Sequence, residues 1–160
     1  MKRSAITLIT ASMLVANAAQ ANEKFVAFAV NHAHERGFHG CDAAIEDAFE
    51  FAGGDDLRVT SDWFKSMDGS LRITGTYGKK NDAVLVDAVL TKSGGKCYAY
   101  HTTIIGYSKS CNATLAELEA FEYVAESPDY IWTENAGGVD MLLTPVGDGC
   151  NATFRRSAVY

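Results

Sequence analysis

Residues 71–107 read LRITGTYGKKNDAVLVDAVLTKSGGKCYAYHTTIIGY, and this stretch decides the fold. Residues 71–77 alternate apolar and polar side chains, which is typical of a strand with one solvated face. Residues 83–90 are almost continuously apolar, as in a central strand, and the Ser-Gly-Gly turn at 93–95 leads into another strand over 97–107. Because these connections are too short for a crossover helix, we predict antiparallel pairing.

The flanking segments supply helices and further strands. Two helices are predicted over residues 23–36 and from residue 42 to the glycines at 53–54. A third is predicted from Thr114, where the sequence has capping-box spacing, to Ser127, which precedes a proline. The other predicted strands are 57–65, 130–133, 139–144 and 154–159. The fold class is therefore α+β. We expect a single domain over 22–160, with about three helices and an antiparallel sheet of about six or seven strands in the order ααββββαβββ, reinforced by disulfides.

The first 21 residues have the pattern of a secretory signal peptide. Lys2 and Arg3 give a positive start, residues 5–16 are almost wholly apolar, and Ala-Gln-Ala at 19–21 forms a small-x-small cleavage site. The apolar run is too short to span a bilayer stably. We therefore expect residues 1–21 to be a removed, bacterial-type leader and the mature chain to be periplasmic or secreted, without a stable membrane anchor.

The four cysteines are Cys41, Cys97, Cys111 and Cys150. In an oxidising compartment they are expected to form two disulfides, not metal ligands or nucleophiles. Three pairings are possible. A Cys97–Cys111 bond requires the intervening strand to be short or bent, so we favour Cys41–Cys111 with Cys97–Cys150.

The chain is acidic, with 14 basic and 20 acidic residues and a net charge of −6. Removal of Lys2 and Arg3 with the leader leaves 12 basic residues against 20 acidic, a net charge of −8. This balance argues against nucleic acid and anionic lipid as partners, because both require a basic surface. A basic protein partner is compatible with it.

Three histidines lie close together in the sequence, at His32, His34 and His39. A helix presents metal ligands on one face at separations of three or four residues, whereas these are separated by two, five and seven. We therefore expect no metal site and no cofactor. One alternative stays open, in which an extended segment lets His32 and His34 bind a metal weakly.

His101 and Asp87 are the polar residues that stand out in the strands. Alternation places His101 on the face of its strand opposite Tyr98 and Tyr100. If His101 lies in a cleft, it could act as a general base. Otherwise we expect a half-buried residue that makes one hydrogen bond. The sequence does not identify an acidic partner for it. Asp87 interrupts the apolar run 83–90. A buried carboxylate at this position would require a partner, but alternation favours an exposed position for Asp87 on the outer face of the sheet.

A set of loop carboxylates and large aromatic side chains predicts a protein-binding surface, because aromatic residues dominate interface energies and carboxylates steer basic partners. These residues are Asp55, Asp56, Trp63, Asp68, Tyr130 and Trp132.

No nucleophile elbow or phosphate-binding loop is present in the sequence. The leading hypothesis is an exported, non-enzymatic protein that binds another protein, such as an inhibitor or immunity factor against a basic cell-wall hydrolase. The alternative is a small-ligand or metal-binding periplasmic protein that uses the Tyr98/Tyr100/His101 strand or the His32/His34 pair. A hydrolase with an unrecognised site, built around His101 in an acidic and aromatic cleft, is a third hypothesis.

Overall fold

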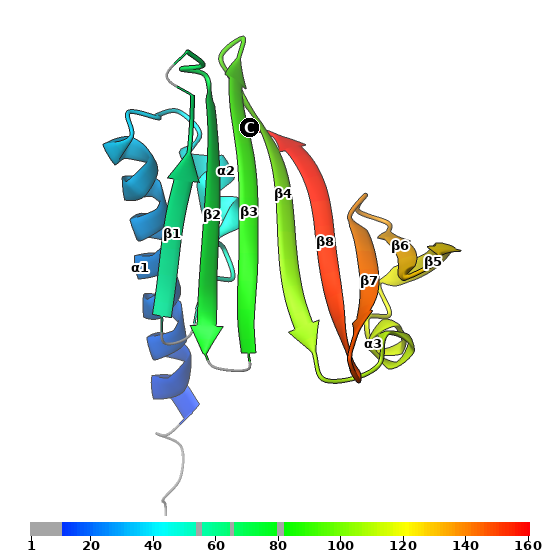
Figure 1. Ribbon diagram of the computed structural model, residues 1–160. Coiled ribbons are helices and arrows are strands. Elements are labelled where there is room, and N and C mark those ends of the chain that lie inside the picture. The colour runs from blue at the N-terminus through cyan, green and yellow to red at the C-terminus, as the bar shows by residue number, and fades with distance from the viewer. Residues whose placement is uncertain (1–10, 54–55, 65, 80–81) are drawn as a thin grey trace, which may run out of the picture.

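The computed structural model describes residues 11–160 except 54–55, 65 and 80–81 (Figure 1). In this part of the chain there are three helices and eight strands. The helices are α1 (Ala11–Glu35), α2 (Asp42–Ala48) and α3 (Cys111–Glu117). The strands are β1 (Asp56–Asp62), β2 (Ser70–Lys79), β3 (Asp82–Ser93), β4 (Lys96–Tyr107), β5 (Phe121–Ser127), β6 (Tyr130–Asn135), β7 (Asp140–Val146) and β8 (Gly149–Val159).

All eight strands belong to one antiparallel sheet in the order β1-β2-β3-β4-β8-β7-β6-β5. The sheet consists of two four-stranded meanders that meet where β4 pairs with β8. At one end of this pair Tyr98 lies opposite Val159, and at the other Tyr107 lies opposite Cys150. Helix α3 connects β4, the last strand of the first meander, to β5, the first strand of the second. The predicted α+β class is confirmed, with eight strands instead of six or seven.

The helices cover one face of the sheet. Figure 1 shows α1 and α2 beside β1–β3, while α3 lies near β7 at the other side. Buried side chains alternate along the strands on this face, as Leu71 and Ile73 do on β2. A larger core lies under α1 and α2, and a smaller one, around Met141 and Leu143, lies against α3. The opposite face of the sheet carries exposed Tyr98 and Tyr100.

A glycine in β2 makes room for the end of α2. Phe49, directly after the helix, is fully buried, and a Cβ added at Gly75 would lie 2.4 Å from its ring. Any side chain at this strand position would therefore push Phe49 out of the core. Gly75 breaks the strand pattern so that the helix can pack closely on the sheet.

The disulfides join Cys41 to Cys97 and Cys111 to Cys150, so the favoured pairing was wrong. The reason is the antiparallel register of β4 and β8, which places Cys97 and Cys150 at opposite ends of neighbouring strands. About ten residues at roughly 3.3 Å each separate those ends, far beyond the span of one disulfide. Each bond instead ties the start of a short helix to the start of a central strand.

The predicted third helix is much shorter than expected. It begins at Cys111, with Ser110 as the N-cap whose hydroxyl accepts a hydrogen bond from the Ala113 amide, and it ends at Glu117. The second part of the predicted helix is strand β5, which forms a hairpin with β6. Phe121, Tyr123 and Val124 favour a strand locally, and the partner strand β6 overrides the helical spacing.

The N-terminal boundary of the first helix also differs from the prediction. Residues 11–21 of the expected leader continue into α1, and residues 1–10 lie outside the described residues. At its other end α1 stops before Gly37, which has a positive φ of 76° that favours glycine. Within the described chain, no helix combines the length and apolar character needed to cross a bilayer.

Both disulfides should stabilise the fold strongly. They close separations of 56 and 39 residues, for which loop-closure entropy gives about 4 kcal/mol each. Replacing Cys111 and Cys150 together by Ala should lower the free energy of unfolding, measured in urea, by about 2–5 kcal/mol. Peptide mapping without reduction is the control and should recover the 41–97 and 111–150 links. A peptide joining Cys41 to Cys111 would contradict this arrangement.

Candidate functional site

The candidate site is a cleft of about 440 Å³ on the helix-bearing face of the sheet. It lies over β4 and β8, between the C-terminal end of α2 and the beginning of β5. Its lining comes from α2 and the residues after it, from β2, β4, β5 and β8, and from the β6–β7 turn. Much of the wall is apolar, with Phe51, Phe121, Phe154 and Ile105. The rings of Phe121 and Phe154 contact edge to face at 5.6 Å between centroids.

A polar cluster forms one wall of this cleft. Asp47 on α2 forms an ion pair through Oδ2 with Arg156 Nη2 at 2.7 Å, and its carboxylate accepts a hydrogen bond from the Tyr160 hydroxyl. The same Nη2 also donates to the Asp47 main-chain oxygen at 3.3 Å. Asp47 is therefore held by a cation and a phenol from the β8 side of the sheet.

His101 lies beside this cluster and is the unusual member of the site. It is 4% exposed, and neither ring nitrogen forms a hydrogen bond with any described residue. Its Nδ1 is 3.8 Å from Asp47 Oδ2, which is too long for a hydrogen bond. The ring also stacks on Tyr160, with 6.3 Å between centroids. A buried imidazole without partners is costly, because a neutral ring offers one donor and one acceptor.

The register of β4 and β8 brings the cluster together. His101 lies directly opposite Arg156, and Tyr160 exchanges main-chain hydrogen bonds with Cys97 at the start of β4. The Cys41–Cys97 disulfide fixes the beginning of α2 at that same end of the strand. Asp47 follows later along α2 and reaches the residues on β8.

Burial and charge set the protonation states of the cluster. Burial acts to raise the pKa of Asp47, but the hydrogen bonds from Tyr160 and Arg156 and the charge of Arg156 outweigh it, so this pKa lies below its ordinary 3.8. Burial lowers the pKa of His101 below its ordinary 6.5, and Arg156 lowers it further. Burial and the bond to Asp47 raise the pKa of Tyr160 to about 12. At neutral pH the cluster therefore contains an aspartate, a neutral histidine and a protonated tyrosine.

This arrangement contains a base without an aligned nucleophile. A neutral His101 can accept a proton, yet it makes no hydrogen bond to a hydroxyl or thiol in the described part of the chain. All four cysteines are in disulfides. His101 therefore lines a cleft with acidic and aromatic side chains, as the third hypothesis requires, but it has no aligned nucleophile among the described residues.

The sequence pointed to His101 but missed Asp47, Arg156 and Tyr160. A signal for Arg156 was present, because alternation along β8 places it on the same face as the half-buried Phe154 and the fully buried Ala152. An arginine at a position that faces the core requires an acidic partner. Asp47 had no comparable signal, because it lies among other carboxylates on a short helix.

The tyrosines of β4 do not join His101. Tyr98 and Tyr100 are exposed on the opposite face of the sheet, as the alternation predicted. The hypothesis of a site that combines all three side chains therefore lacks the necessary geometry.

The histidines of α1 point to different partners. His32 Nε2 lies 3.0 Å from Ser61 Oγ on β1, whereas His34 Nε2 lies 2.9 Å from Asp42 Oδ1 at the start of α2. The rings of His34 and His39 are 4.5 Å apart between centroids. No group of three suitable ligands forms a metal site among the described residues. The pair His32/His34 therefore does not converge on one ion.

Asp87 has a structural partner. Arg72 Nε donates to its carboxylate at 2.8 Å, and the Thr74 hydroxyl donates at 2.6 Å. Both partners lie on the neighbouring strand β2, on the outer face of the sheet. This cross-strand ion pair accounts for a carboxylate within an apolar run.

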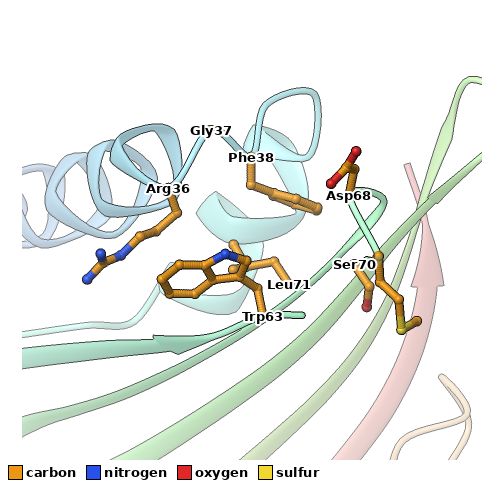
Figure 2. Close-up of a pocket in the computed structure, with 8 residues that line it drawn as sticks. Arg36, Gly37, Phe38, Trp63, Asp68, Ser70 and Leu71 are labelled. Atoms are coloured by element: carbon orange, nitrogen blue, oxygen red, sulfur yellow. The ribbon is translucent and has the colours of Figure 1, made fainter. Parts of the chain in front are cut away.

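The predicted protein-binding residues lie in separate places. Trp63 and Asp68 lie in the β1–β2 connection and line a hollow of about 220 Å³ (Figure 2). The guanidinium of Arg36 lies over the Trp63 ring, 4.9 Å from its centroid. Asp56 lies at the other end of β1. Asp55 is outside the described residues.

Tyr130 and Trp132 are on β6, on the far side of the sheet from β1. The Trp132 indole donates to the Ser127 hydroxyl on β5 at 3.3 Å. The five of these residues that the structure describes thus do not assemble into one surface, and the binding role of the set stays a prediction.

Comparisons with known proteins add no constraint: no protein-family model, no curated protein and no solved structure matches this chain.

The Asp47 cluster should give stability a dependence on pH. Asp47→Asn removes the charge held by Arg156 and Tyr160, so the free energy of unfolding at pH 7 should fall by about 1–3 kcal/mol. In the folded protein the pKa of Asp47 lies below the ordinary 3.8. The stabilisation by the charged carboxylate is therefore complete at pH values above 3.8, and it is lost as the pH falls through the pKa of the folded state. Urea unfolding at pH 7, 5 and 3 should therefore show the two proteins converging at low pH.

The matched control is Asp129→Asn, which changes an exposed carboxylate in the β5–β6 turn. It should alter stability by less than about 0.5 kcal/mol at each pH. A difference between wild type and Asp47→Asn that stays constant from pH 7 to 3 would contradict the assigned ionisation.

Proposed function

We propose that this protein is an exported, non-enzymatic binding protein whose cleft between α2, β4 and β8 holds a small amphipathic molecule. The observation that carries the proposal is His101, a buried polar side chain that lines the cleft and has no hydrogen-bond partner among the described residues. A ligand with a polar group would satisfy the imidazole and recover the free energy of an unmet hydrogen bond.

The size and chemistry of the cleft support this proposal. A volume of about 440 Å³ lies within the range of small-molecule sites in proteins, about 300–1,000 Å³. Such sites combine apolar walls with a few convergent polar groups. Here the aromatic rings of Phe51, Phe121 and Phe154 supply the first feature, and His101 with Arg156 supplies the second.

The compartment belongs to the same proposal. Two disulfides are typical of proteins that work in an oxidising environment. Together with the leader pattern of residues 1–21, they support export to the periplasm or the medium after signal-peptide removal. The acidic net charge supports partners other than nucleic acid.

Binding of an uncharged probe tests the cleft. The folded protein without residues 1–21 should bind N-phenyl-1-naphthylamine, a neutral aromatic dye, at one saturable site, with enhanced dye fluorescence. Ala48→Trp places an indole in the cleft and should weaken binding by about tenfold or more, because the ring occupies the ligand volume.

The matched control is Ala43→Trp, the same change at an exposed position of α2, which should bind the dye like wild type. Circular dichroism checks that both variants fold. The proposal fails if wild type shows no saturable binding, or if the two tryptophan variants bind equally well.

A second candidate function rests on the β1–β2 connection. Trp63, Phe64 and Met67 are 43%, 72% and 53% exposed, so large apolar side chains gather on one short segment between Asp62 and Asp68. Exposed apolar groups flanked by carboxylates suit a basic protein partner. We propose on this ground that the protein also antagonises a basic cell-wall hydrolase, as an inhibitor or immunity factor.

Inhibition of a purified basic muramidase measures this second function. The protein should inhibit the enzyme, and Phe64→Ser should weaken that inhibition by about tenfold because it removes a central apolar contact. Phe28→Ser, which changes a half-exposed phenylalanine on α1, is the control and should act within twofold of wild type. Equal potency of the Phe64 variant and wild type would overturn the assignment of this surface.

A further inference from the structure

We propose that the molecule held in the cleft is a monocarboxylate with an aromatic or short aliphatic body, and that Arg156 binds its carboxylate. This inference rests on the proposed function of the cleft and adds the chemical class of the ligand. It also assigns a specificity-determining role to Arg156.

The charged groups of the cleft leave an arginine available to a ligand. Arg156 and Asp47 are the charged side chains that face the cleft, whereas alternation along β8 turns the exposed side chain of Arg155 toward the opposite face of the sheet. Asp47 already has Arg156 and Tyr160 as partners, and the described lining holds no second carboxylate for a cationic ligand. The preference for an anion therefore rests on the donors of Arg156 that Asp47 leaves unused.

Arg156 has donors to spare. Both of its contacts with Asp47 come from Nη2, an ion pair with the carboxylate and a hydrogen bond to the main-chain oxygen. The Nε and Nη1 groups make no hydrogen bond with the described residues, and the side chain is 38% exposed. A guanidinium has five N–H donors in a planar fork, and a carboxylate can accept two of them side by side. Asp47 thus holds the Arg156 side chain in place and leaves its Nε and Nη1 donors available for a ligand.

His101 lies where the same ligand can complete its contacts. It faces Arg156 directly across the β4–β8 pair, and opposite residues of an antiparallel pair have their Cβ atoms about 5 Å apart. A carboxylate held by Arg156 would therefore lie beside the His101 ring, whose two nitrogens are buried and have no partner among the described residues. The charged and titratable groups that face this histidine are Asp47, Arg156 and Tyr160, and Asp47 is already neutralised by its partners.

The remaining walls define the body of the ligand. Phe121 and Phe154 contact each other edge to face, and Ile105 lies on the neighbouring strand. These side chains suit one or two fused rings or a short alkyl chain, and the volume of about 440 Å³ limits the length. The carboxylate of the ligand lies at Arg156, and its apolar body lies against Phe121 and Phe154.

Three ligands that share one ring system test the head group. Titration calorimetry at pH 7 should show 2-naphthoate binding about tenfold or more tightly than 2-naphthalenemethanol, because charge-assisted hydrogen bonds from Arg156 exist only for the carboxylate. The cation 2-naphthalenemethylamine should bind more weakly than the alcohol. Equal affinity for acid and alcohol, or a preference for the amine, would overturn the inference.

Variants at Arg156 connect the preference to this side chain. Arg156→Gln should abolish the preference for the carboxylate while the neutral dye N-phenyl-1-naphthylamine still binds. Arg156→Lys keeps a positive charge beside Asp47 but lacks the planar guanidinium, so it should reduce the preference for the carboxylate. If the Gln variant does not fold, the Lys variant provides the test. Arg58→Gln is the matched control: it makes the same change at an exposed arginine of β1 that does not line the cleft, and it should retain the preference.

The outcomes separate the two levels of the proposal. If the neutral dye binds wild type but Arg156→Lys keeps the full preference for the acid, the role of Arg156 is wrong and the cleft remains a binding site. If the neutral dye and all three naphthalene compounds fail to bind wild type, the proposed function itself fails.

Discussion

The antiparallel pairing of β4 with β8 is the constraint on which the rest of the structure depends. It joins two meanders into one sheet and sets which side chains of the central strands face the helices. A shift of one residue in this register would move His101 or Arg156 to the opposite face. The two disulfides reinforce the pairing at its two ends, because Cys97 and Cys150 each lie at the start of one of these strands.

This constraint also explains why a cleft exists. Each short helix is tied at its N-terminus to one end of the β4–β8 pair, so α2 and α3 lie over different parts of the same face. Seven residues make α2 about two turns long, and it ends before it covers the middle of the strands. The uncovered region between the helices contains Phe154 and Ile105 as well as the polar cluster.

Local pattern was enough to predict much of the fold but little of the site. Alternation has a period of two residues, so it correctly assigned the faces of β2 and β4, including the placement of His101 opposite Tyr98 and Tyr100. The pairing of β4 with a strand more than forty residues away leaves no local pattern, and this produced the wrong disulfides. The same limit hid Asp47, because its role depends on Arg156 and Tyr160, which are distant in the sequence. Strand β5 was missed because its helical spacing competed with pairing to β6.

Under the proposed function, the polar cluster serves ligand recognition more than stability. Placing Arg156 on the inner face of β8 requires desolvation of a cation, and Asp47 compensates for much of this cost without a large net gain. An apolar residue at that position would extend the core between Ala152 and Ala158 and remove the need for Asp47. Such a replacement would also leave His101 as the main polar group lining that wall. A bound ligand, as proposed above, would complete the hydrogen bonds that His101 and the unused donors of Arg156 lack.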